Sequence, residues 1–379
     1  MQQKLITLAV AALASGTALA QSSNVQIYGF LDMGFSHRSD SYNPHVGSKN
    51  SLDSGITAGN RLGFKGTEDL GNGLKALFTL EAGFALDDGN HAQGGRLFGR
   101  QAFLGLTGDF GTVIAGRLYT PHYTFLSAVD PFKAGTVGRY RNVYDVGVDA
   151  GGENLLDPVR VDNTVAYVSP TFSGFNVTAA YSANAIGQEN QENGHDNTVI
   201  ALLPRYTNGP IDVGVSYHRI QDNDSGAGVF SLEKPKITDL TVAGTYDFKV
   251  VKLAAIYDRN KITASNNPLP NQGNNAKLKS WLIGATVPFG KHAIQVSYTQ
   301  SKWDDFTDDS AGKTKQWAVG YTYDLSKRTG FYAAYADLNN DNEKGNKAGK
   351  VQRTSAIGDG SNGGTTYQSG FQFGLKHAF

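Results

Sequence analysis

The sequence predicts an all-β protein, a transmembrane antiparallel β-barrel of about sixteen strands with an inserted third long loop. Apolar and polar residues alternate in many segments, the connections between these segments are alternately short and long, and the chain is rich in glycine and aromatic residues. A sheet within a membrane must close on itself, because a free edge would leave backbone groups unpaired in hydrocarbon. Together these observations favour a barrel over an open sheet.

The composition excludes several other classes of protein. The chain has 379 residues, with 46 Gly, 18 Tyr, 20 Phe and no Cys, and its 34 basic residues balance its 34 acidic residues. Without cysteine there is no disulfide framework, thiolate zinc site or cysteine nucleophile. The balanced charge provides no general basic surface, so we expect no nucleic-acid partner. Composition alone leaves a secreted β-enzyme, an adhesin and a membrane barrel open.

The N-terminus predicts export. Lys4 precedes an apolar stretch over 5–14, and Ala18-Leu19-Ala20 is an A-x-A cleavage pattern. This arrangement is typical of a secretory signal peptide, and the apolar stretch is too short to span a membrane. We therefore expect 1–20 to be the signal peptide and 21–379 to be the outer-membrane barrel.

The alternation is clearest at the C-terminus, where odd positions from Tyr367 to Phe379 are mostly aromatic or apolar and even positions are polar or small. Successive strand side chains point to opposite faces of a sheet, so one face of this segment is apolar. A soluble β-sandwich is disfavoured, because the polar faces carry too many charged residues for a dry core. The expected strands are 24–36, 57–68, 74–86, 97–107, 111–118, 160–169, 175–183, 197–206, 211–220, 236–247, 250–260, 277–288, 291–303, 314–324, 330–338 and 366–379.

The connection over 119–158 stands out by its length. Structureless loops of this size in compact domains are usually functional, and we expect this one to fold into the barrel and narrow it. Charged rings in a channel set its ion preference. Alternation places Arg61, Lys65 and Arg160 on the polar, inward face, whereas it does not decide the direction of Arg100.

Several motifs resemble one known family. Residues 61–76 (RLGFKGTEDLGNGLKA) resemble a block of the general diffusion porins of β-proteobacteria, the neisserial type. Residues 109–117, with Arg117, are similar to the strand pair that leads into the constriction loop of that family. Further similarities are Arg141-Asn142 within that loop, NTVAYVSP at 163–170, LSKRT at 325–329 and the terminal KHAF at 376–379.

The resemblance implies a homotrimer of sixteen-stranded barrels, each with its own pore for ions and small hydrophilic solutes. It also implies that arginines at 61, 100 and 160 face acids on the inserted loop, such as Asp130. The loop departs from the family at 120–125 (TPHYTF), which leaves the ion preference open. The candidate constriction residues are Arg61, Lys65, Arg100, Arg117, Asp130, Arg139, Arg141 and Arg160.

We therefore expect a passive, anion-preferring general porin in the outer membrane, with no enzymatic activity, cofactor or metal. The alternative is a channel specific for a sugar or an organic anion, for which Tyr119, Tyr123 and Tyr140 are the candidate aromatic lining. An outer-membrane enzyme would need a serine or aspartate in register with a histidine, and the pattern shows none. Expected partners are outer-membrane lipid and lipopolysaccharide, and the barrel-assembly machinery, which would read Phe379 as a terminal signal.

Overall fold

The structure is a computed structural model that describes residues 24–39, 48–144, 149–150, 153–154, 158–187, 197–221, 236–263, 272–306, 313–341 and 367–379. The expected signal peptide, 1–20, lies outside these ranges. No helix within them is long and apolar enough to cross a membrane.

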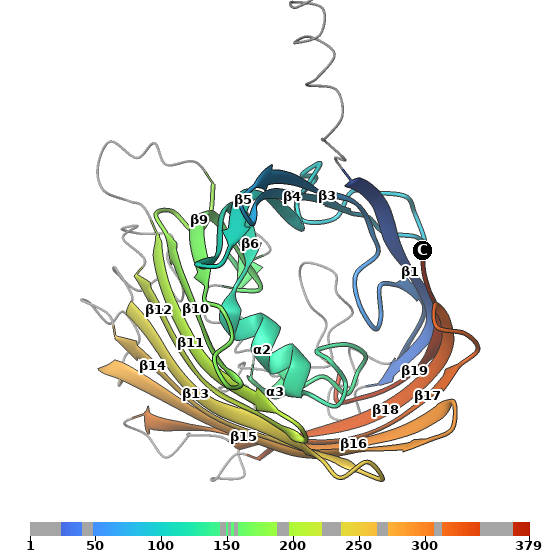
Figure 1. Cartoon of the computed structure of the whole chain (residues 1–379). Helices are drawn as coiled ribbons and strands as arrows, with labels where there is room; N and C mark the ends of the chain where they lie inside the picture. The colour runs from blue at the N-terminus through green and yellow to red at the C-terminus, as the bar shows by residue number, and fades with distance from the viewer. Residues whose placement is uncertain are drawn as a thin grey trace, which may run out of the picture.

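The barrel strands form one antiparallel sheet that closes where β1 pairs with β19 (Figure 1). Two helices and a short hairpin lie between β6 and β9 along the chain. The strands are β1 (Asn24–Ser39), β2 (Ser48–Ser54), β3 (Arg61–Gly71), β4 (Leu74–Gly83), β5 (Gln101–Gly108), β6 (Gly111–Tyr119), β9 (Arg160–Val168), β10 (Phe175–Ser182), β11 (Thr198–Asn208), β12 (Ile211–Gln221), β13 (Lys236–Asp247), β14 (Lys252–Thr263), β15 (Gln272–Phe289), β16 (His292–Phe306), β17 (Lys313–Asp324), β18 (Thr329–Asp341) and β19 (Ser369–Ala378). The intervening elements are α2 (Pro121–Val129), α3 (Arg141–Tyr144) and the hairpin of β7 (Asp149–Ala150) with β8 (Glu153–Asn154).

Two of these strands share one position in the barrel. β3 pairs with residues 24–30 of β1, and β2 pairs with residues 33–39 of the same strand. Counting β2 and β3 as one interrupted strand gives sixteen positions in the 17-stranded sheet. The predicted closed sixteen-strand barrel is therefore confirmed.

The strand β2 corrects one detail of the sequence prediction. The polarity of 37–54 predicts a loop, but 48–54 forms a strand in which Leu52 is the one large apolar residue. Polar segments can extend a sheet because the backbone, and not the side chains, makes the hydrogen-bond ladder. For the same reason β15 and β16 run beyond the predicted 277–288 and 291–303.

The two faces of the barrel differ in the way that the alternation predicts. In β14, Leu253 and Tyr257 are exposed on the outside, whereas Ile256 and Asp258 are buried on the inside. An outer face of exposed apolar side chains suits hydrocarbon and would be unstable in water. Other large apolar side chains exposed on the strands include Leu104, Val165, Val242, Ile283, Trp317 and Phe373.

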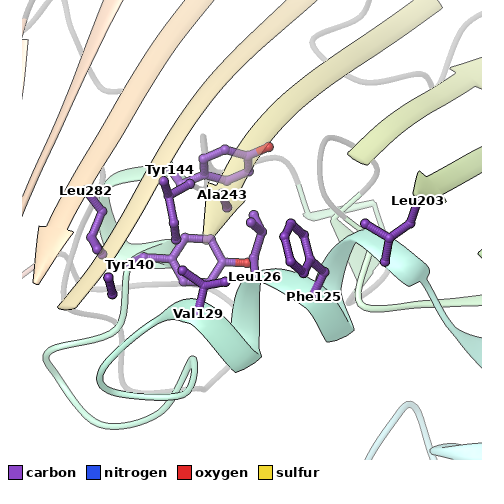
Figure 2. Close-up of a cluster of buried hydrophobic side chains, with 10 residues drawn as sticks. Phe125, Leu126, Val129, Tyr140, Tyr144, Leu203, Ala243 and Leu282 are labelled. Atoms are coloured by element: carbon purple, nitrogen blue, oxygen red, sulfur yellow. The ribbon is translucent and has the colours of Figure 1, made fainter. Parts of the chain in front are cut away.

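The helix α2 packs along the inner wall of the barrel (Figure 1). Thr120 caps its N-terminus by accepting a hydrogen bond from the backbone N–H of Tyr123 at 3.1 Å. A proline at the first position suits a helix start, because its missing N–H would have no partner there. Figure 2 shows the buried cluster that results, with side chains from the loop against the wall. Its members are Phe125, Leu126, Val129, Tyr140, Tyr144, Leu203, Ala243, Ala254, Ile256 and Leu282.

The rest of the described loop is held by a second cluster and by amide side chains from the wall. Phe132, Val137 and Val143 pack against apolar residues of β17 and β18. The Gln372 Oε1 atom accepts a hydrogen bond from the Val137 N–H at 2.7 Å. Gln316 accepts from the Asn142 amide at 2.9 Å and donates to the Gly138 carbonyl at 3.1 Å. These contacts fix the loop on the side of the bore formed by β11–β19.

A buried polar cluster also joins the loop to the wall. Tyr144 donates to Asp239, and its oxygen lies 3.1 Å from Asp258 Oδ1. His122 contacts Ser216 at 3.1 Å through Nδ1 and Tyr144 at 3.2 Å through Nε2. All five side chains are at most 3% exposed. Buried polar groups are costly unless hydrogen-bonded, so this cluster favours one position of the loop.

We expect Tyr144→Phe to loosen the loop, because it removes the hydroxyl that links α3 to two buried carboxylates. Losing one hydrogen bond to a buried carboxylate costs about 1–3 kcal/mol, while Thr241 still donates to both carboxylates. Single-channel recording should show more current noise and a higher mean conductance. The matched control is Tyr257→Phe, which alters an outward-facing tyrosine of the same wall strand that carries Asp258. Identical noise and conductance in wild type and both variants would contradict the role of the cluster.

Candidate functional site

The inserted loop and the opposite wall enclose a cavity of about 580 Å³. Six cationic side chains line it, and none of its lining residues in the described part of the chain is acidic. They come from both sides, three from the wall or its adjoining turn and three from the loop. The wall provides Arg61, Arg100 and Arg160, and the loop provides Lys133, Arg139 and Arg141.

The three wall arginines are positioned by different contacts. Arg61 donates to the Gly59 carbonyl at 3.2 Å and lies over the ring of Phe30. Arg100 forms a buried ion pair with Glu81 at 2.7 Å, so its charge is largely balanced. Arg160 lies opposite Tyr119 in the pairing of β9 with β6. All three line the cavity.

Two tyrosines connect the wall arginines to the loop. The Tyr119 oxygen accepts hydrogen bonds from Arg100 at 2.5 Å and from Arg160 at 3.1 Å. The ring of Tyr119 stacks on the ring of Tyr123, with centroids 5.6 Å apart and planes 14° apart. Arg141 in turn lies 5.5 Å from the centre of the Tyr123 ring. Cations and aromatic rings therefore alternate along one side of the cavity.

The loop tip has an unusual backbone. Lys133, Ala134 and Thr136 all have positive φ, which is uncommon for residues other than glycine. A side chain at Gly135 would clash with the carbonyl oxygen of Thr57. Such conformations persist only where the surroundings enforce them, and they cluster at functional sites. Here the tip crosses to the opposite wall, where the Thr136 N–H donates to the Ile56 carbonyl at 2.7 Å.

Asp130 does not face the arginines, and this corrects the sequence expectation. Its side chain is 2% exposed and absent from the cavity lining. It accepts backbone hydrogen bonds from Phe132 at 3.1 Å, Ala134 at 2.9 Å and Tyr140 at 3.2 Å. Burial raises the pKa of Asp130 to about 6, although the three N–H donors oppose this rise. Asp130 thus organises the loop tip instead of forming an acidic side of the pore.

Arg117 and Lys65 also lie elsewhere. Arg117 pairs with Asp162 at 2.6 Å, and its side chain does not line the cavity with the other arginines. Lys65 lies over the ring of Tyr28 and lines a separate cavity of about 330 Å³. Both side chains sit on the expected strands, but alternation along a strand defines the face and not the height of a residue.

The sequence did not single out Asp32, which shapes the wall opposite the loop. Its carboxylate accepts from the Thr57 N–H at 2.5 Å and from the Thr57 hydroxyl, and Tyr332 donates to it at 2.6 Å. The bonds to Thr57 hold the segment between β2 and β3, of which residues 55–59 line the cavity. The sequence signal that could have identified it is an aspartate that alternates with outward apolar residues in the predicted strand 24–36.

Phe379 completes the closing seam. Its N–H donates to the Gly29 carbonyl at 3.1 Å, and its own carbonyl accepts from the Gly29 N–H at 3.0 Å. Its ring is 45% exposed.

Ser216, His122 and Asp239 lie together but do not have the geometry of a catalytic triad. Ser216 Oγ and Asp239 Oδ1 lie 3.1 Å and 3.7 Å from the same imidazole nitrogen, Nδ1. A triad needs the base and its orienting acid on different nitrogens, with an accessible nucleophile. Ser216 and His122 are fully buried. No group of three potential metal ligands occurs among the described residues.

Comparison with known proteins identifies the family. A family model described as Gram-negative porin matches residues 7–343. An outer membrane porin protein of Bordetella pertussis is 32% identical over 370 residues, which cover 88% of this chain and 93% of that protein. Outer membrane porin protein 32 of Delftia acidovorans is 31% identical over 382 residues, covering 100% of both chains. The solved structure of the anion-selective porin from Comamonas acidovorans superposes with a TM-score of 0.76 at 26% identity, covering 94% of this chain and 100% of that one.

These relatives are channel proteins of the outer membrane and not enzymes. The predicted function and location are confirmed: the chain belongs to the Gram-negative porin family and forms an outer-membrane pore for small solutes.

Proposed function

We propose that this porin favours anions, because its constriction carries positive charge on both sides. The observation that supports this is the cavity with six cationic side chains and no acidic one among its described lining residues. Only Arg100 among the wall arginines has a described carboxylate partner at the cavity, Glu81. Rings of basic side chains favour anions in pores.

This proposal differs from the arrangement that the resemblance implies, in which arginines of the wall face acids of the loop. With Asp130 buried in the loop, the described loop offers the bore Lys133, Arg139 and Arg141 in place of an acid. The described lining of the cavity is therefore positively charged on the loop side as well as on the wall side. The anion selectivity stated for the Comamonas relative supports the same sign.

A channel specific for a sugar or an organic anion remains the second candidate. The observation in its favour is the Tyr119–Tyr123 pair at the cavity. Tyr140 does not contribute, because it is 1% exposed within the loop cluster. Saturable uptake of one solute class, with other solutes of equal size unsaturated, would favour this second function.

In planar bilayers under a KCl gradient, the wild-type reversal potential should show a preference for chloride. Arg139→Gln should lower the chloride-to-potassium permeability ratio severalfold, because one charge at ~4 Å in water contributes ~1 kcal/mol. Arg259→Gln is the matched control, since Arg259 is exposed on the outer face of β14. A cation preference in wild type that Arg160→Ala leaves unchanged would exclude the anion proposal.

We also propose the remaining features of the family for this chain: cleavage after Ala20, a homotrimer, contact with lipopolysaccharide, and recognition of Phe379 by the barrel-assembly machinery. The apolar outer face supports lipid contact and subunit packing. The terminal aromatic on an amphipathic strand supports the assembly signal.

A trimer with one pore per subunit should close in three equal steps after a single insertion event, because each barrel conducts independently. Single-channel recording at high voltage measures the steps. Native gel migration, compared before and after heating, provides the control for assembly. Closure in one step from a species of monomer mass would contradict the trimer.

A further inference from the structure

We infer that Tyr119 is a positioning residue for selectivity, holding two arginines side by side through an acceptor that adds no negative charge. This inference rests on the proposed anion preference. It assigns to the tyrosine an action on the arginines, and not on a passing solute.

Tyr119 is hydrogen-bonded to both arginines. Its phenol oxygen accepts from Arg100 Nη2 at 2.5 Å and from Arg160 Nη2 at 3.1 Å. A phenol has one O–H donor and can accept hydrogen bonds through its lone pairs. Two guanidinium groups repel each other, so a shared acceptor between them fixes a separation that they would not otherwise keep.

The oxygen of Tyr119 is a neutral acceptor. Arg100 also binds the carboxylate of Glu81 at 2.7 Å, which balances its charge. Tyr119 gives Arg160 an oxygen acceptor without a negative charge, so the positive charge of Arg160 stays in the bore. A carboxylate at position 119 would hold the same two groups and remove the potential that attracts anions.

The rings of Tyr119 and Tyr123 also contact arginines. The Arg160 guanidinium carbon lies 4.6 Å from the centre of the Tyr119 ring, and the ring of Tyr123 stacks at 5.6 Å. Tyr123 similarly contacts Arg141 at 5.5 Å. Each ring therefore has a cation and another ring against it. Contact with an aromatic ring also orients a guanidinium.

The position of Tyr119 in the chain explains why it can hold the two arginines. Tyr119 is the last residue of β6, and it lies opposite Arg160, the first residue of β9. Thr120, which follows it, caps α2 and donates to the Pro158 carbonyl at 2.8 Å. Tyr119 therefore lies where both ends of the inserted loop meet the wall, and its backbone is fixed from both sides.

The test is a double-mutant cycle in planar bilayers with Tyr119→Phe, Arg160→Gln and the double variant. Tyr119→Phe keeps the ring and removes the shared oxygen. It should lower the chloride-to-potassium permeability ratio roughly three- to tenfold, the equivalent of one hydrogen bond. In the Arg160→Gln background the same change should have a much smaller effect, because its main target is gone.

Tyr181→Phe, an exposed outward tyrosine, is the control and should match wild type. Heat-dependent gel migration confirms that every variant forms the barrel. If wild type prefers cations, the proposed function and this inference both fail. If wild type prefers anions and Tyr119→Phe does too, to the same degree, only the inference fails. If Tyr119→Phe lowers the permeability ratio equally in wild type and in the Arg160→Gln variant, its role is structural, and the inference is also overturned.

Discussion

The closed hydrogen-bond ladder is the constraint on which the rest of this structure depends. In hydrocarbon an unpaired strand edge has no water to satisfy it, so the sheet must join its ends. β1 and β19 make that seam, and Phe379 extends it to the last residue. Sixteen positions then give a bore too wide to be filled by the side chains of the wall. Selectivity must therefore come from a segment that is added to the bore.

The inserted loop meets this need by changing the inner wall locally. Leu203, Ile256 and Leu282 point inward at positions where alternation favours polar residues, and α2 covers them. Burial of apolar side chains stabilises the docked loop by ~25 cal/mol per Å² removed from water. The buried polar cluster around Tyr144 adds direction to this attraction, because its hydrogen bonds form in one arrangement. Apolar packing thus holds the loop on the wall, and the hydrogen bonds determine its position there.

Local alternation predicted much of the fold, because period two is a property of each strand alone. It indicated the strand count, the lipid face and the inward direction of Arg61 and Arg160. It failed at β2, where polar residues carry no alternation, and at Asp130, whose partners are backbone groups of its own loop. One contact could have been predicted from the sequence. The strands on either side of the inserted loop pair with each other, and this pairing places Tyr119 opposite Arg160.

The burial of Asp130 and the positive charge of the described cavity lining are connected. A strained tip with three positive-φ residues needs an acceptor for its free N–H groups, and a carboxylate is a strong one. An aspartate used in this way does not line the bore, and the charged loop residues that line the described cavity are Lys133, Arg139 and Arg141. The wall arginines Arg100 and Arg160 lie close together, and a neutral acceptor such as Tyr119 can hold them without adding negative charge. The geometry of the loop tip and the charge of the described cavity lining therefore both depend on where Asp130 and Tyr119 are placed.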